Sequence, residues 1–389
     1  MTKAKVLILD GDAAHAVAIM ECLKKSGYAT AVICSETLSY GYHSRLADER
    51  FVGPDSHSPE YDSFLIDFLK NNHFDVLIPT SDATAEFMSR NKAELRPITG
   101  VLMPDMDVFM KAYDKNQLME VCRCNKFPHP LTVDLSKTPT DAPELKKFPF
   151  PALIKPNLTS GGRGMTLVNN FAEFKETYPN IKEQYGDCHL QQFIKPGGRQ
   201  IKVQIFTDNN CHPLCSSVIW KQRYYPVNGG SSCCNITIED DKTVEICSMV
   251  LKKIGWVGFA DFDLIENPLT GELLIMEINP RIPACVRSAF KSGADYATMI
   301  ADTVLNKSIK KQVYRPGVRL RHLGFDILWF LKSPNRLTVK PSWFRFFGRK
   351  TYYQDWVGFG VYSFICGTLG NLRKLRNSEF RAAKGGVKI

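Results

Sequence analysis

The stretch 259-FADFDLIENPLTGELLIMEINPR-281 contains two apolar runs joined by a turn with a glycine, so it predicts a β-hairpin. In the second strand, Glu277, Asn279 and Arg281 occupy every second position, and their side chains therefore point the same way. An antiparallel strand with one face in water would explain this alternation without any function. The remainder of the chain has to decide between that explanation and a binding site.

The same hairpin brings Asp263, on its first strand, close to Glu277 and Asn279 on its second. Two carboxylates and an amide oxygen are ligands that suit Mg²⁺. Arg281 adds a fork of donors that can face phosphate or carboxylate oxygens. Two carboxylates without a cation are tolerated only in full solvent, and the apolar run LLIM argues against full solvent. The hairpin therefore predicts a magnesium site that faces an anionic ligand.

A glycine-rich segment, 154-IKPNLTSGGRGM-165, lies upstream of the hairpin. Lys155 stands at a strand end, and Ser160, Gly161, Gly162 and Gly164 follow before the next strand. Glycines let backbone N–H groups fold onto phosphate oxygens, and the lysine supplies a point charge. The alternative is a flexible hairpin loop with solvated charges. The segment is neither a Walker A loop nor a kinase glycine-rich loop.

Strand and helix signals alternate through the first hundred residues, which predicts an α/β domain with a parallel sheet covered by helices over 1–110. Residues 111–305 predict an antiparallel-rich α+β unit with a cleft lined by polar residues. The remaining segment, 306–389, is a basic, aromatic-rich extension. From residue 307 onwards it carries 18 Lys and Arg against three acidic residues, whereas the rest of the chain has 32 basic and 37 acidic residues.

The N-terminus lacks the long apolar segment of a secretory signal, and the twelve cysteines form no CxxC pair with partner ligands. We therefore expect a cytoplasmic protein with reduced thiols and no structural zinc site.

In their order along the chain, these motifs resemble those of the ATP-grasp ligases of the carboxylate–amine type, with a nucleotide clamp similar to that of carbamoyl phosphate synthase. The resemblance covers about residues 1–305 and implies a Rossmann-like domain before the ATP-grasp domain. It implies ATP and two Mg²⁺ as cofactors, with Mn²⁺ as the alternative ion. The ions would be held by Asp263, Glu277 and Asn279, and the catalytic residues would be Arg281, Lys221 and Arg223.

The resemblance also assigns the nucleotide site. Lys115 and Lys155 would contact the phosphates beneath a lid formed by residues 160–164, and the backbone of Phe193 and Ile194 would meet adenine. The family usually has glutamates in the hinge and in the next strand, whereas this chain has Gln192 and Gln200, which bind ribose more weakly. Lys221 and Arg223 precede a second glycine loop that would face the acyl substrate, although an exposed hairpin tip with solvated cations is the alternative.

The implied reaction joins a small-molecule carboxylate to an amine through an acyl phosphate, with release of ADP and phosphate. Two other classes remain open: phosphoryl transfer without ligation, and a nucleotide-binding, membrane-associated module that has lost catalysis. Within the extension, Trp329, Trp343 and Trp356 alternate with cations. Either the extension packs its aromatic residues on the enzyme body, or it docks peripherally on the anionic inner face of a membrane. A membrane-spanning anchor and nucleic-acid binding are not expected, and a homodimer stays open.

Overall fold

The computed structural model describes residues 3–159, 162–227, 230–358 and 360–374. Its N-terminal part is a four-stranded parallel sheet in the order β3-β2-β1-β4, and this confirms the predicted α/β unit. The strands β1, β2 and β4 are apolar almost throughout because helices cover both faces of the sheet. The elements are β1 (Lys5–Leu9), α1 (Ala14–Lys25), β2 (Ala29–Cys34), β3 (Glu49–Val52), α2 (Tyr61–Asn71), β4 (Val76–Pro79), α3 (Asp82–Arg90) and α4 (Lys92–Leu95).

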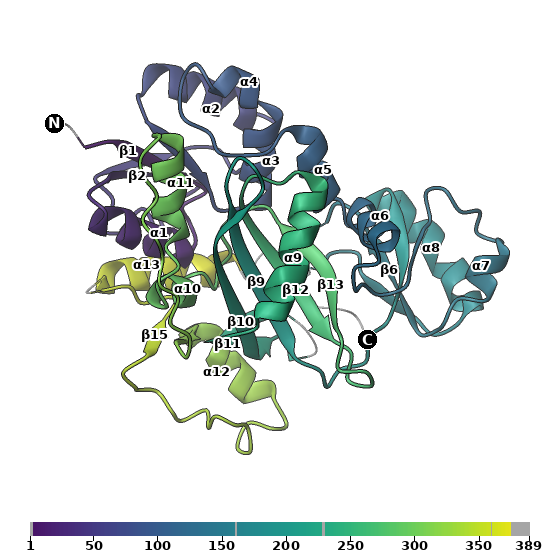
Figure 1. Cartoon of the computed structure of the whole chain (residues 1–389). Coiled ribbons are helices and arrows are strands. Elements are labelled where there is room, and N and C mark those ends of the chain that lie inside the picture. Colours follow the sequence, from purple (N-terminus) through teal and green to yellow (C-terminus); the bar gives the residue numbers. More distant parts are fainter. Residues whose placement is uncertain (1–2, 160–161, 228–229, 359, 375–389) are drawn as a thin grey trace.

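A small antiparallel sheet, in the order β5-β8-β6-β7, projects to one side of the molecule (Figure 1). Two short helices, α5 and α6, precede its strands. Helix α8 was not predicted, and it packs Phe174 and Tyr178 into the core of this sheet. The elements are α5 (Met106–Tyr113), α6 (Lys115–Asn125), β5 (Thr132–Asp134), α7 (Pro143–Lys146), β6 (Ala152–Pro156), β7 (Thr166–Val168), α8 (Phe171–Tyr185) and β8 (Cys188–Gln192).

The largest sheet has seven strands in the order β13-β12-β9-β10-β11-β14-β15, and it contains the predicted hairpin as β12 and β13. Helix α9 covers one face, where Ile201, Val203 and Ile205 of β9 pack against it. Because side chains alternate along a strand, the other face receives the polar residues of the same strands. The elements are β9 (Gln200–Thr207), β10 (Pro213–Tyr225), β11 (Ser231–Ile238), α9 (Asp241–Ile254), β12 (Gly258–Glu266), β13 (Leu273–Asn279), α10 (Arg287–Lys291) and α11 (Tyr296–Val304).

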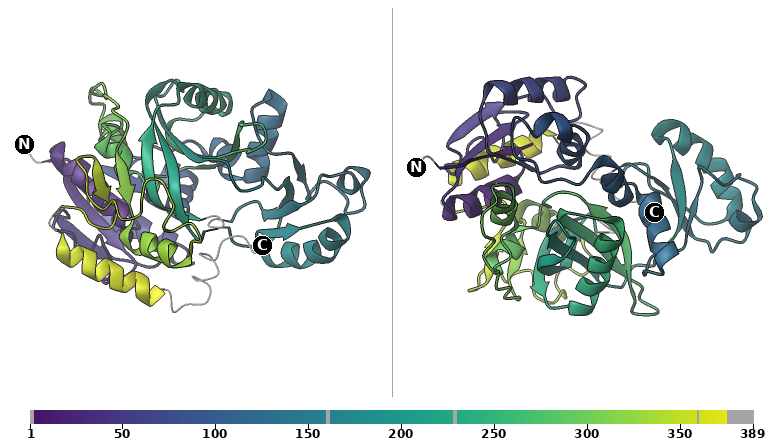
Figure 2. Two further views of the ribbon diagram at one scale, coloured as in Figure 1. Left: turned by 90° about the horizontal axis from the view of Figure 1, so that it is seen from below. Right: turned by 45° about the horizontal axis from the view of Figure 1, so that its top comes forward.

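The C-terminal extension continues this fold instead of forming a separate unit. Strands β14 (Arg319–Arg321) and β15 (Thr351–Tyr353) lengthen the seven-stranded sheet at its edge. Helix α12 (Leu323–Lys332) packs against β10 and β11 and buries Trp329. Helix α13 (Val361–Lys374) lies along the N-terminal domain at the periphery of the molecule (Figure 2). The extension therefore lengthens the seven-stranded sheet and also contacts the N-terminal domain, where Ser363 of α13 donates to the Tyr40 carbonyl.

Candidate active site

The polar face of the seven-stranded sheet is built by four neighbouring strands. Lys202 of β9 pairs directly with Asp263 of β12, and Asp263 in turn pairs with Glu277 of β13. Asp261 lies two residues before Asp263 and Asn279 two residues after Glu277, so both share this face. The sheet register thus places three carboxylates, an amide and an ammonium group side by side.

An ion network joins these side chains. Lys202 Nζ lies 2.6 Å from both Asp261 Oδ2 and Asp263 Oδ2, and Lys221 Nζ of β10 lies 2.7 Å from Asp263 Oδ1. Burial alone would raise the pKa of Asp263, but Lys202 and Lys221 hold it well below its usual range. Burial raises the pKa of Asp261 in spite of Lys202, because Asp261 is fully buried. Although burial opposes it, the two aspartates raise the pKa of Lys202, so its ammonium stays charged.

Lys115 reaches the site from α6, and Lys155 reaches it from β6 of the small sheet. The Asp114 carboxylate caps α6 by accepting hydrogen bonds from the next backbone N–H groups, which fixes Lys115 at the first position of the helix. Lys115 Nζ donates to the Thr159 carbonyl at 2.6 Å. Lys155 is 4% exposed and donates to Gln191 Oε1 at 3.0 Å. Burial lowers the pKa of Lys155 to about 8, although Glu277 opposes this shift.

The glycine loop between β6 and β7 is described from residue 162 onwards, so the predicted lid residues Ser160 and Gly161 lie outside the described residues. Gly162 and Gly164 have φ values of +77° and +74°, a conformation that favours glycine. The loop is therefore built around positions that other residues adopt only with strain.

The predicted hinge residues Gln192, Phe193 and Ile194 line a pocket with a cavity volume of about 170 Å³, together with residues 149–151 and 267–269. The Gln192 side chain accepts a 3.5 Å hydrogen bond from the Leu131 backbone N–H. Gln200 begins β9, opposite Ile265 and Lys221. The hinge thus connects the small sheet to the strand that carries Lys202.

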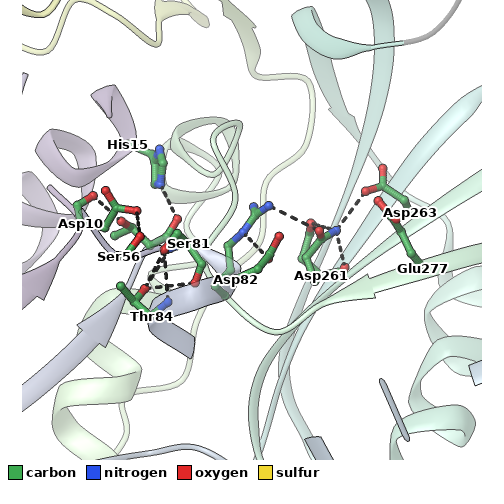
Figure 3. Close-up of polar contacts among 12 residues, drawn as sticks. Asp10, His15, Ser56, Ser81, Asp82, Thr84, Asp261, Asp263 and Glu277 are labelled. Carbon is green, nitrogen blue, oxygen red and sulfur yellow. Dashed lines mark hydrogen bonds and ion pairs between the residues drawn. The ribbon is translucent and has the colours of Figure 1, made fainter. Parts of the chain in front are cut away.

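Figure 3 shows Asp82 of the N-terminal domain beside Asp261 of the seven-stranded sheet. Arg281 links these two parts of the structure. Its Nε donates to Asp82 Oδ1 at 3.0 Å, and one of its terminal nitrogens lies 3.4 Å from Asn279 Oδ1. Asp82 is held at the start of α3 by a capping box that Ser81 forms with Thr84. Because α3 begins shortly after β4, the carboxyl end of that strand, where ligands bind in many parallel-sheet proteins, lies next to the polar face.

The prediction for Arg223 is corrected by the structure. Arg223 is 2% exposed, and two of its nitrogens donate to the Asp326 carboxylate at 2.8 Å. A β-bulge causes this: Lys221 pairs with Asn235, but Arg223 pairs with the adjacent Cys234, so the expected alternation is lost and the two cations fall on opposite faces. Only Lys221 faces the site. Arg223 holds α12 against the sheet.

Arg287 also has a structural position. Its guanidinium donates to the carbonyls of Tyr353 and Trp356 and lies 3.5 Å from Glu21 Oε2. It is 5% exposed. Arg287 therefore connects the C-terminal extension to α1 and does not point into the polar face.

The donor set fits a divalent cation in part. Within the described ranges, no group of three or more His, Cys, Asp and Glu side chains is arranged to hold a metal ion. Glu277 is the most accessible carboxylate, since its side chain is 37% exposed and Lys115 Nζ lies 3.8 Å away, beyond hydrogen-bond distance. Both oxygens of Asp263 accept from lysines, and Asn279 directs its NH₂ group towards Asp261 and Asp263. Glu277 thus fits Mg²⁺ directly, whereas Asp263 fits it only if a lysine contact is exchanged.

Sequence reasoning missed four residues of this site: Lys202, Asp261, Gln191 and Asp82. A signal existed for Lys202, because it alternates with apolar residues in 199-RQIKVQIF-206 as Glu277 does in its own strand. No such signal existed for Asp82, which meets Arg281 only through the packing of two domains.

Comparison with known proteins gives results in line with this geometry. Residues 112–285 match the family model of the ATP-grasp domain, the family that the motifs resemble. The chain is 22% identical to the D-aspartate ligase of Enterococcus faecium over 303 residues, which cover 72% of each protein. It spans only 18% to 30% of the length of the pyruvate carboxylase and carbamoyl phosphate synthase chains that also match.

Solved structures share the fold. The biotin carboxylase domain of 2-oxoglutarate carboxylase from Hydrogenobacter thermophilus, a dimer in complex with MgADP and bicarbonate, superposes with a TM-score of 0.67 at 17% identity, over 82% of this chain and 74% of that one. The N5-carboxyaminoimidazole synthetase of Staphylococcus aureus gives a TM-score of 0.65 at 14% identity, over 86% and 87%. These similarities confirm the fold class.

Proposed function

We propose that the protein is an ATP-dependent ligase that joins a carboxylate to an amine through an acyl phosphate and releases ADP and phosphate. The observation that carries this proposal is the convergence of two buried ammonium groups, Lys115 and Lys155, on the carboxylate of Glu277 at the edge of a polar sheet face. A nucleoside triphosphate needs cations that bind its phosphates and a carboxylate that binds its metal ion. The names of the relatives, a D-aspartate ligase among them, support ligation.

ATP and Mg²⁺ are the cofactors that we propose, with Mn²⁺ as the alternative ion. Glu277 would hold one ion, and Asp263 with Asn279 would hold a second once a lysine contact of Asp263 is exchanged. Bound Mg²⁺ would neutralise charge on the transferred phosphate. Lys115 and Lys155 would bind the phosphates from the opposite side, under the loop that contains Gly162 and Gly164.

In the first step, an oxygen of the substrate carboxylate attacks the γ-phosphorus, the bond from that phosphorus to the β–γ bridging oxygen breaks, and ADP leaves. Lys221 and Arg281 would orient the carboxylate, since both lie beside Asp263 or Asn279 at the polar face. Asp82 fixes the guanidinium of Arg281. Two anions are thereby brought together against a set of fixed cations.

In the second step, the amine nitrogen attacks the acyl carbon, the bond from that carbon to the phosphate oxygen breaks, and the amine loses a proton as phosphate leaves. The reaction needs no protein nucleophile. Closure of the glycine loop would exclude water, which otherwise hydrolyses the acyl phosphate. The substrates are thus a small carboxylic acid and a small amine, and we expect the reaction in the cytoplasm.

ADP release across a panel of carboxylates and amines, with mass spectrometry of the products, tests the proposal. With the correct acid and no amine, hydroxylamine should trap a hydroxamate because the acyl phosphate then waits in the site. ADP formation with acid alone and no hydroxamate would favour phosphoryl transfer. No ADP from any pair, in a protein whose melting temperature still rises with ATP and Mg²⁺, would indicate the module that has lost catalysis.

A further inference from the structure

Helix α13 carries its large apolar side chains on the side that faces away from the protein. The residues that it buries are small: Ser363, Cys366, Gly367 and Gly370. Its outward residues are large and apolar, and they are between 46% and 62% exposed: Val361, Tyr362, Ile365, Leu369 and Leu372. A surface helix of a globular protein normally does the reverse. This outward row, which we call the α13 stripe, therefore matches an apolar environment.

The contacts of α13 with the N-terminal domain fix this orientation. A Cβ atom at Gly367 would lie 2.3 Å from the Tyr40 ring, and one at Gly370 would lie 2.0 Å from the Leu38 carbonyl oxygen. The Ser363 hydroxyl donates to the Tyr40 carbonyl at 2.6 Å. Because only small residues allow such close approach, the helix cannot rotate to bury its large side chains. These contacts therefore hold the α13 stripe on the outside of the protein.

Aromatic residues and cations accompany the α13 stripe. Trp356, which is 43% exposed, lies with its ring centroid 5.2 Å from that of Phe364, and Tyr362 packs edge-on against His43. Tryptophan and tyrosine favour the interface between hydrocarbon and lipid headgroups. The last turn of α13 contains Arg373 and Lys374, of which Lys374 pairs with Glu36. The sequence beyond adds four Lys and Arg against a single glutamate.

We propose that α13 docks the protein on an anionic membrane surface, with the helix in the plane of the interface and the α13 stripe in the hydrocarbon. The 14 described residues of α13 fall short of the ~20 that a spanning helix needs. In the part of the chain that the structure describes, no helix is long and apolar enough to cross a membrane.

The positive charge near the α13 stripe favours an anionic lipid surface as its partner over a second copy of the chain. From residue 361 onwards the sequence carries six basic residues and one acidic residue, so two facing copies would repel each other. Anionic headgroups attract the same cations, most strongly at low salt. This proposal goes beyond the proposed ligase activity, and neither depends on the other.

Co-sedimentation of the full-length protein with vesicles tests the docking. We expect binding to phosphatidylcholine vesicles that contain phosphatidylglycerol, weaker binding at high salt, and little binding to pure phosphatidylcholine. The double variant Ile365→Gln/Leu369→Gln should lose affinity on the order of a hundredfold, because each half-exposed Leu or Ile that enters hydrocarbon contributes roughly a factor of ten. Glutamine keeps helix propensity, and the two side chains point away from the body, so thermal unfolding and ADP release should not change.

A matched control is Met249→Gln on α9, since Met249 is also on a helix and 45% exposed but lies far along the chain from α13. It should bind vesicles as the wild type does. Wild-type protein that stays in the supernatant with anionic vesicles overturns the proposal, as does a double variant that binds like the wild type. A wild-type dimer in light scattering that the double variant converts to a monomer would assign the α13 stripe to a second copy instead.

Discussion

Lys155→Met should stabilise the protein without nucleotide while it removes nucleotide binding. Burial lowers the pKa of Lys155 from 10.5 to about 8, a difference of about 2.5 units. Each unit corresponds to ~1.36 kcal/mol, so the buried ammonium costs about 3 kcal/mol at pH 7. The side chain is 4% exposed, and solvent therefore screens it little. A neutral methionine of similar length avoids this cost.

One contact opposes the gain. Lys155 Nζ donates to Gln191 Oε1 at 3.0 Å, and Gln191 is fully buried. An acceptor left without its donor costs ~1–3 kcal/mol, so the net stabilisation should be about 1 kcal/mol. The pH dependence has a definite sign. Between about pH 8 and 10.5 folded Lys155 binds fewer protons than unfolded Lys155, and wild-type stability therefore rises with pH there. The variant lacks this rise.

Urea unfolding at pH 7 and at pH 9.5 measures both effects, and the shift in melting temperature with ATP and Mg²⁺ reports nucleotide binding. Lys202→Met is the matched control, because the same exchange on the polar face should have the opposite sign where two aspartates raise the lysine pKa. If Lys155→Met is destabilised to the same extent as Lys202→Met and keeps the wild-type pH slope, the reasoning about the buried ammonium is wrong.

Three further outcomes follow from charged residues, two of them in the site and one, Asp10, directly after β1. Lys202→Met should cost ~3–5 kcal/mol of unfolding free energy, because Asp261 is then buried without its cation, and adding Asp261→Asn should restore most of the loss. Glu277→Gln should abolish ADP release yet change the unfolding free energy by less than ~1 kcal/mol, since this partly exposed side chain contributes little packing. Burial, and next to it the charge of Asp12, raises the pKa of Asp10 to about 6. The wild type therefore loses stability as the pH rises from about 4 to 6. Asp10→Asn should be more stable than the wild type in thermal unfolding at pH 7, and it should show no gain at pH 4.

Much of the fold was predictable because the pattern of apolar and polar residues indicates its strands. The parallel strands of the N-terminal domain are apolar, and the hairpin of β12 and β13 combines apolar runs with polar residues at every second position; the structure confirms both. Helix α8 was missed because Pro179 lies within it, and proline normally ends a helix. The strands β14 and β15 were missed because each has three residues, too few for a pattern.

The candidate site shows the same division. Asp263, Glu277 and Asn279 were placed together correctly because one hairpin carries them and its register follows from its turn. Arg223 was misplaced because a single extra residue in β10 reverses the face, and no residue type marks that bulge. Asp82 could not be found, since its contact with Arg281 spans 199 positions and depends on how two domains pack.

The charges of the site indicate why metal ions belong in the proposed reaction. The cations and anions that line it nearly balance: Lys115, Lys155, Lys202, Lys221 and Arg281 against Asp82, Asp261, Asp263 and Glu277. Most of that positive charge is already paired, because Lys202 and Lys221 hold Asp263 and Arg281 holds Asp82. A nucleoside triphosphate and a carboxylate together carry roughly five negative charges, which one surplus cation cannot neutralise. Divalent cations at Glu277 and at Asp263 would supply the difference, and a lysine displaced from Asp263 would then be free to meet the incoming carboxylate.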